Sequence, residues 1–145
     1  GGTWKYAALR VIAMRMKYGA VEASIGKSWD RFIASFEKGD ADASASMFTA
    51  SAINMVPMNE NNVNREGVLA LFKDFLSNNK VEKLKVTPHE LEVVGPVAYQ
   101  WGTFEETTVP KKGKTIVSKS RFYAVWNLEA DGTWRFHRFL FNALP

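Results

Sequence analysis

The chain of 145 residues contains no cysteine and only two histidines. Without cysteine it forms no disulfide framework, no zinc site with thiolate ligands and no cysteine nucleophile. The two imidazoles, His89 and His137, lie in separate predicted strands and have no carboxylate at ligand spacing. Because a catalytic zinc ion usually takes three protein ligands, we predict that the protein binds no metal.

Long apolar runs and phosphate-binding motifs are missing as well. No stretch of about twenty uncharged apolar residues occurs, so we expect no membrane-spanning helix. The glycines stand singly and at turns, and there is no phosphate loop, dinucleotide fingerprint or nucleophile elbow. We therefore predict that the protein uses no cofactor.

The excess of positive charge lies near the N-terminus. The formal net charge is +4, from 19 Lys and Arg against 15 Asp and Glu. Four basic residues precede the first acidic residue, Glu22, and the rest of the chain is balanced at fifteen of each sign. A neutral body argues against nucleic-acid binding, which needs clustered Lys and Arg.

Residues 1–24 are predicted to form an N-terminal helical arm, and residues 25–145 a single domain. Apolar residues of the arm recur at helical spacing, at Trp4, Ala7, Val11, Met14 and Tyr18. Its basic residues are spread around the helical wheel, which is not typical of a helix that binds a membrane surface. We expect the arm to pack on the domain or on a second subunit; the remnant of a targeting sequence is the alternative.

After Gly26, the segment Ser28–Lys38 has the clearest helical pattern in the chain. Its apolar residues follow the spacing of a buried helical face, at Trp29, Phe32, Ile33 and Phe36. Gly39 suits the left-handed position just past the end of this helix, and Asp40 suits the N-cap of a shorter helix.

A third helix is predicted to follow Asn64 as its N-cap, after a short strand at residues 52–58. Its buried face comprises Val68, Leu71, Phe72, Phe75 and Leu76. From Val81 the pattern alternates, which predicts strands at residues 84–94, 97–109, 115–128 and 133–144, separated by hairpin turns. Helices followed by an antiparallel meander indicate an α+β fold.

The first long strand contains a break in its alternation. Leu84 and Val86 share one parity, whereas Leu91 and Val93 have the other. Because proline occurs in sheets mainly at edges and bulges, we predict a β-bulge near Pro88. Such a bend gives the sheet the curvature that a hollow interior requires.

Four short motifs follow one another along the chain. They are Trp29 to Asp40, Arg65-Glu66-Gly67-Val68, Arg121-Phe122-Tyr123-Ala124-Val125-Trp126, and Trp134-Arg135-Phe136-His137-Arg138 leading to Asn142. In this order they resemble the SnoaL-like and ketosteroid-isomerase-like family of the nuclear transport factor 2 superfamily. The resemblance implies a cone-shaped, curved antiparallel sheet wrapped around N-terminal helices, an α+β barrel like that of nuclear transport factor 2. It also implies a pocket at the wide end and, often, a homodimer joined through the outer sheet face.

The resemblance does not imply one reaction, because the superfamily includes isomerases, cyclases, dehydratases, epoxide hydrolases and proteins without catalysis. Close relatives often carry an acid in the last strand, at the position of Phe139 in this chain. Phenylalanine neither accepts nor donates a proton, so either another group takes over the acid-base role or the protein binds without turnover.

Three residues are the candidates for catalysis. His89 adjoins the predicted bulge, which can turn a side chain toward a cavity, and Asp30 on the first helix is a second possible base. Tyr99 is a candidate hydrogen-bond donor to an oxyanion. Each has an ordinary structural alternative, which is solvation for His89 and Asp30 and a place in the core for Tyr99.

Five residues are the candidates for ligand binding: Asn54, Trp101, Phe122, Trp126 and Arg138. We expect Tyr99 and Trp101 to share the concave face of the sheet with Phe122 and Trp126. The ligand is then a small apolar molecule with a polar handle, which is isomerised, cyclised or dehydrated. The alternative is a non-catalytic ligand-binding or dimerisation module. The cytoplasm is the default compartment, since a cleaved leader leaves no trace in this sequence.

Overall fold

The computed structural model describes residues 2–145, except for the side chains of residues 10–16. Within this range, three helices and six strands follow one another as α1 (Gly2–Glu37), α2 (Ala41–Ser46), β1 (Phe48–Met55), β2 (Asn62–Val63), α3 (Asn64–Asn78), β3 (Asn79–Val94), β4 (Val97–Pro110), β5 (Ile116–Leu128) and β6 (Trp134–Ala143). Among the helices described, none combines the length and apolarity needed to cross a membrane.

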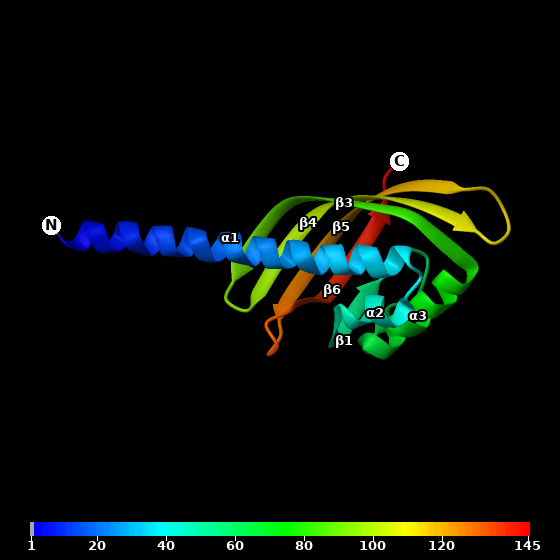
Figure 1. Cartoon of the computed structure of the whole chain (residues 1–145), viewed down its shortest axis with the longest axis horizontal. Coiled ribbons are helices and arrows are strands. Elements are labelled where there is room, and N and C mark those ends of the chain that lie inside the picture. Colours follow the sequence, from blue (N-terminus) through cyan, green and yellow to red (C-terminus); the bar gives the residue numbers. More distant parts are fainter. Residues whose placement is uncertain (1) are drawn as a thin grey trace.

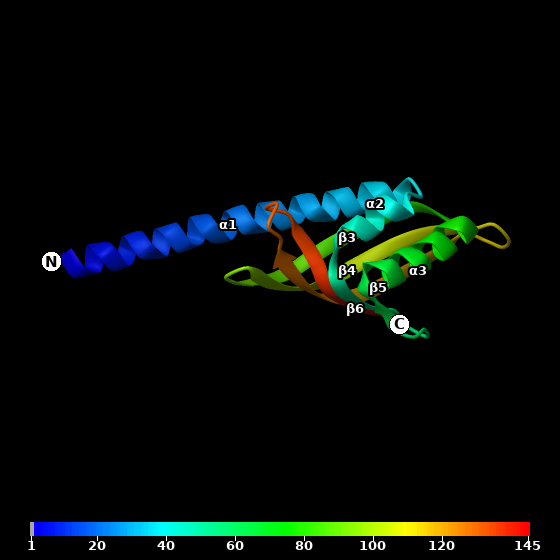
Figure 2. The ribbon, with the colours of Figure 1, turned by 90° about the horizontal axis from the view of Figure 1, so that it is seen from below.

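The strands form one curved sheet in the order β2-β1-β6-β5-β4-β3. Neighbouring strands are antiparallel, except that β1 and β6 run parallel. Helix α1 lies across one face of the sheet, while α2 and α3 lie beside β1 (Figures 1 and 2). In the part of the chain that the structure describes, the sheet does not close on itself. The predicted α+β fold, with a curved sheet around N-terminal helices, is confirmed.

Helix α1 is continuous, so the prediction of two helices separated at Gly26 is wrong. A glycine inside a helix costs only about 1 kcal/mol relative to alanine. Val21, Ile25 and Trp29 lie four residues apart on one stripe that spans Gly26, and all three are buried. Burying these side chains is worth about 1.5–3 kcal/mol each, which outweighs the penalty of the glycine.

The first half of α1 projects beyond the sheet (Figure 1). Residues 2–9 are exposed, whereas the hydroxyl of Tyr18 donates to the carbonyl of Leu91 in β3 at 2.9 Å, so the arm contacts its own domain at Tyr18. The side chains of Val11 and Met14 lie outside the described part of the chain. The predicted boundary between residues 24 and 25 falls inside α1, and the division into arm and domain stays a prediction.

The caps around α2 follow the sequence prediction, whereas the cap of α3 does not. Gly39 has a positive φ of 75°, and the Asp40 carboxylate accepts a hydrogen bond from the backbone N–H of Ala43 at 3.0 Å. Asn64 is itself the first residue of α3, with a φ of 66°, and the N-cap is Val63, whose side chain makes no capping bond.

Three β-bulges bend the long strands, and the first of them leaves Glu82 as the extra residue of β3. The register of β3 against β4 shifts between Pro88 and Glu90, which confirms the predicted bulge and leaves His89 as the extra residue. The register of β5 against β6 shifts as well, and His137 is the extra residue there. Each bulge reverses the faces of the residues beyond it and increases the local twist. Both histidines of the protein therefore stand where the sheet bends.

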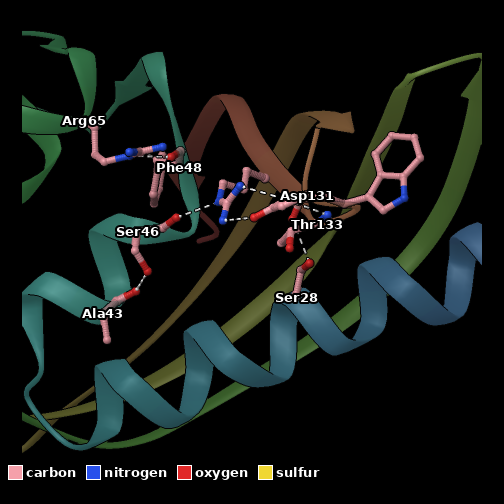
Figure 3. Close-up of polar contacts among 9 residues, drawn as sticks. Ser28, Ala43, Ser46, Phe48, Arg65, Asp131 and Thr133 are labelled. Atoms are coloured by element: carbon pink, nitrogen blue, oxygen red, sulfur yellow. Dashed lines mark hydrogen bonds and ion pairs between the residues drawn. The ribbon is translucent and has the colours of Figure 1, made fainter. Parts of the chain in front are cut away.

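Two arginines of the motifs quoted above hold the turn between α2 and β1 (Figure 3). The Nε of Arg65, at the start of α3, donates to the carbonyl of Phe48 at 2.8 Å. The Nε of Arg135 donates to the carbonyl of Ser46 at 3.0 Å, and its two terminal nitrogens bond the carboxylate of Asp131. This pairing lowers the pKa of Asp131 to about 2. Arg65 and Arg135 thus have structural partners, which fixes the start of β1 against α3 and β6.

Candidate functional site

A cavity of about 300 Å³ lies between the concave face of the sheet, α1 and α3. Its wall is mainly aromatic, with rings from Trp29, Phe32, Phe36, Phe48, Phe72, Phe75, Phe104, Phe136, Phe139 and Phe141. Many of these rings pack edge to face or stacked; for example, Phe36 and Phe75 are parallel at 5.8 Å between centroids. The rings form a rigid apolar lining that suits the hydrocarbon part of a small molecule.

A buried hydrogen-bond network fixes the wall next to the cavity. The side-chain oxygen of Gln100 accepts from the indole N–H of Trp29 at 2.9 Å and from that of Trp126 at 3.1 Å. Each indole would otherwise carry an unpaired buried donor, at a cost of about 1–3 kcal/mol. Gln100 therefore joins α1 to β4 and β5 and fixes the orientation of Trp29.

Glu106 is the one ionisable side chain among the described residues that line the cavity. It lies on β4, between Leu84 of β3 and Ser118 of β5. Ser120 lies two residues further along β5, opposite Phe104. The hydroxyl of Thr108 donates to its carboxylate at 2.6 Å. Burial raises the pKa of Glu106 above its ordinary value, and this hydrogen bond opposes part of the rise. The carboxyl group is thus poised to exchange a proton.

Asn54 on β1 adds a second polar group to the cavity lining. Its side chain is only 3% exposed, and its Oδ1 has no hydrogen-bond partner among the described residues. Buried polar atoms in folded proteins are nearly always paired. An unpaired amide oxygen beside a cavity is therefore a candidate contact for a ligand.

The three predicted catalytic residues do not reach the cavity. Asp30 is exposed on α1. His89 is exposed and stacks on Trp101, with ring centroids 4.7 Å apart, because the bulge turns it to the outer face of the sheet. Tyr99 is 37% exposed on that same outer face. The expectation that Tyr99 faces inward is wrong, because the inner positions of β4 are the even-numbered residues.

Of the five predicted ligand-binding residues, Asn54 alone lines the cavity. Trp101 lies on the outer face and is 42% exposed. Phe122 and Trp126 point inward as predicted, but they are buried in the core, where Phe122 stacks behind Phe139 at 5.7 Å. Arg138 donates to the carbonyl of Ser51 instead of facing the cavity.

The bulge at His137 explains the error on the last strand. Trp134 and Phe136 face inward before the bulge, and Phe139 and Phe141 face inward after it. Without the bulge, strict alternation would place Arg138 on the inner face after Trp134 and Phe136, and Phe139 on the outer face. With it, Phe139 is part of the cavity wall.

His137 is half-buried and its Nδ1 lies 2.9 Å from the hydroxyl of Thr49. Burial, together with the charge of Arg138, lowers its pKa. Since His137 is not among the residues that line the cavity, it has a structural contact rather than a place in the site.

No three side chains of His, Asp or Glu come together among the residues whose side chains are described. The absence of a metal and of a cofactor stays a prediction. Glu106 is the site residue that the sequence analysis missed. One signal was available: Glu105 and Glu106 are adjacent in a predicted strand, so one of the two carboxylates must face inward.

Comparisons with known proteins agree with this geometry. A ketosteroid isomerase-like protein from Erwinia carotovora atroseptica superposes with a TM-score of 0.75 at 15% identity, covering 85% of this chain and 95% of its own. A nuclear transport factor 2-like protein with a cystatin-like fold from Novosphingobium aromaticivorans gives 0.74 at 16% identity, covering 92% and 88%. A nuclear transport factor 2-like superfamily protein from Salmonella enterica gives 0.75 at 15% identity, covering 88% and 94%.

At such low identity these likenesses establish the fold alone. No curated protein matches the sequence. The model of the SnoaL-like domain family, however, matches residues 29–137, which is more than half of the chain and runs from the aromatic face of α1 to the bulge in β6. The chain therefore belongs to the family of SnoaL-like domains.

Proposed function

We propose that the cavity binds a small apolar molecule and that Glu106 exchanges a proton with it, in a cofactor-free isomerisation, cyclisation or dehydration. The observation that carries this proposal is a single carboxyl group in an aromatic cavity. Burial raises the pKa of Glu106 above its ordinary value, which is the direction that suits a carboxyl group acting as an acid-base catalyst. The membership of the SnoaL-like family supports a binding or isomerase-type fold in general.

In this proposal the side chains at the polar end divide the work. Glu106 removes a proton next to an activated position and returns it elsewhere on the same molecule. Ser118, Ser120 and the amide of Asn54 supply hydrogen bonds to an oxygen on which charge develops. The aromatic wall excludes water, which strengthens these interactions. His89, Asp30 and Tyr99 have no place in this scheme, because none of them lines the cavity.

Proton exchange measured in heavy water tests the catalytic proposal. Unsaturated bicyclic ketones are incubated with the protein, and deuterium incorporation and double-bond migration are followed by NMR. We expect Glu106→Gln to slow the exchange by about 10²–10⁴-fold, the usual contribution of a positioned acid-base group. Because the base must be ionised, the wild-type rate should rise with pH through the raised pKa of Glu106.

Glu105→Gln is the matched control, since Glu105 is the neighbouring residue and its side chain lies on the opposite face of β4. There its Oε2 lies 3.8 Å from the Nζ of Lys119. It should leave the exchange rate unchanged, as should His89→Ala. A rate that is the same in Glu106→Gln as in the wild type contradicts the catalytic proposal.

The second candidate function is a non-catalytic binding or dimerisation module. A specific observation favours it: Trp101, Tyr123 and Leu140 are paired across three neighbouring strands on the outer face, and each is more than 40% exposed. A row of large apolar side chains on a sheet face is typical of a surface that another subunit covers. The two functions are compatible, because the row and the cavity lie on opposite faces of the sheet.

A further inference from the structure

The charges around the cavity restrict what it can hold. Its lining contains the carboxyl group of Glu106 and, among the described residues, no Lys, Arg or His. A ligand with a carboxylate or phosphate would meet no cation there and would be repelled by the ionised form of Glu106. In a poorly solvated site this repulsion is not screened by water.

The hydrogen-bonding groups define which polar ends the cavity can bind. The carboxylate of Glu106 accepts one hydrogen bond, from Thr108, and has lone pairs left over. The Oδ1 of Asn54 is buried and accepts none from the described residues. The ionised carboxylate of Glu106 offers acceptors alone, whereas the amides of Asn54 and Asn59 and the hydroxyls of Ser118 and Ser120 offer both donors and acceptors. A neutral polar end of either kind can therefore be bound, and negative charge is what the lining does not match.

We infer that the cavity selects ligands whose polar end carries no negative charge, with the carboxylate of Glu106 as the group that rejects anions. A hydroxyl group, a ketone and a protonated amine all meet this condition, and the aromatic rings of the wall can also contact an ammonium group through their faces. This selectivity rests on one part of the proposed function, namely that the cavity binds a ligand. It requires no catalysis.

Four probes with the same apolar body test the selection: adamantanemethanol, adamantanemethylamine, adamantanecarboxylate and methyl adamantyl ketone. The body is compact and does not fluoresce, so binding can be followed by the fluorescence of the five tryptophans and by calorimetry. At pH 8, where Glu106 is more ionised, we expect the best of the alcohol, the amine and the ketone to bind at least about tenfold more tightly than the carboxylate. These three arms show which polar end the site prefers.

Variants assign the selection to its residues. Glu106→Gln removes the charge, so the carboxylate should bind more tightly than to the wild type and its disadvantage against the alcohol should shrink. If the amine binds, its affinity should fall by about tenfold or more in this variant, because it loses a charged partner. Glu105→Gln should change neither ratio. Circular dichroism and thermal melting confirm that each variant is folded, and the wild-type series decides the question even without the variants.

The outcomes separate the inference from the proposed function. Binding of the carboxylate as tightly as the best of the other three probes overturns the inference and leaves ligand binding intact. Binding of none of the four probes overturns both the inference and the ligand-binding part of the proposed function. Selective binding together with unchanged proton exchange in Glu106→Gln supports the inference and contradicts catalysis.

Discussion

At the scale of single residues, Glu106 should make the free protein less stable as the pH rises. Burial raises its pKa, so the folded state holds the proton more tightly than the unfolded chain does. Stability from this group is therefore full below the unfolded pKa, about 4.3, and is lost as the pH rises through the folded pKa. Glu106→Gln should accordingly gain stability over the wild type between acidic and neutral pH, as measured by urea unfolding at a series of pH values.

The control for this experiment is again Glu105→Gln, which should stay within about 0.5 kcal/mol of the wild type, as is usual for surface substitutions. A Glu106→Gln variant that loses stability relative to the wild type as the pH rises would show that the carboxylate is better satisfied than its surroundings indicate. A gain in stability with a loss of binding is the behaviour expected of a functional group held in an unfavourable environment.

Single residues were also the hardest part of the site to predict. The alternation in β4 predicts Tyr99 and Trp101 on its inner face, because large aromatic side chains usually lie inside. The structure places Ala98, Gln100 and Gly102 there instead. The space above them is filled by Trp29 from α1 and by Trp126 and Phe122 from β5, so small or hydrogen-bonding side chains fit. The size of the inner side chains of β4 therefore depends on residues from other elements that pack over them, and the pattern along the strand does not reveal these residues.

At the scale of the elements, the bend between β3 and β4 depends on Gly102. A Cβ atom at this position would lie 2.5 Å from the carbonyl oxygen of Thr87 and 2.9 Å from the ring of Phe122. The backbone of β3 would have to move, which typically costs about 1–3 kcal/mol. We expect Gly102→Ala to lower the free energy of unfolding by this amount in chemical denaturation.

Gly26→Ala is the opposite case in the same protein. Nothing lies within 4 Å of a Cβ atom placed there, and the residue is inside α1. Alanine should therefore stabilise the protein by roughly 0.5–1 kcal/mol. If both substitutions change stability by the same sign and size, close packing at Gly102 is not the cause.

The bulges show what a sequence pattern can and cannot reveal about elements. The break in parity between Leu84 and Leu91, next to a proline, predicted the bulge at His89 correctly. The last strand contains an equivalent break, with Phe136 on one parity and Phe139 on the other. It went undetected because no proline marks it and because the strand is apolar on both faces. Because of this bulge, Phe139 lies in the cavity wall.

At the scale of the whole molecule, the fold could be predicted because helical and alternating patterns segregate along the chain. The helical spacing of Trp29, Phe32 and Phe36 and the turns between the later strands were sufficient for the α+β assignment. The arm was harder to place, because a helix that passes an isolated glycine looks like two helices in sequence. What the arm packs against in an assembly depends on the surface of a second chain, which the sequence pattern of one chain does not reveal.

The outer face of the sheet gives the last prediction, which concerns assembly. Trp101, Tyr123 and Leu140 form a row there, and His89 stacks on its edge against Trp101. We expect two copies of the chain to pair through this row. Trp101→Glu places a charge within the contact and should weaken the dimer by roughly tenfold or more, as is common for a tryptophan buried in an interface. Sedimentation velocity over a range of concentrations measures the effect.

Ile116→Glu is the control, because Ile116 is also exposed, at 54%, but its neighbours in the alternation of β5 place it on the inner side of the sheet. A wild-type protein that sediments as a monomer at all concentrations, or equal weakening by both substitutions, contradicts the assignment of this face. Since the cavity opens on the other side of the sheet, Trp101→Glu should leave the affinity for the adamantane probes unchanged, so that assembly and binding can be judged independently.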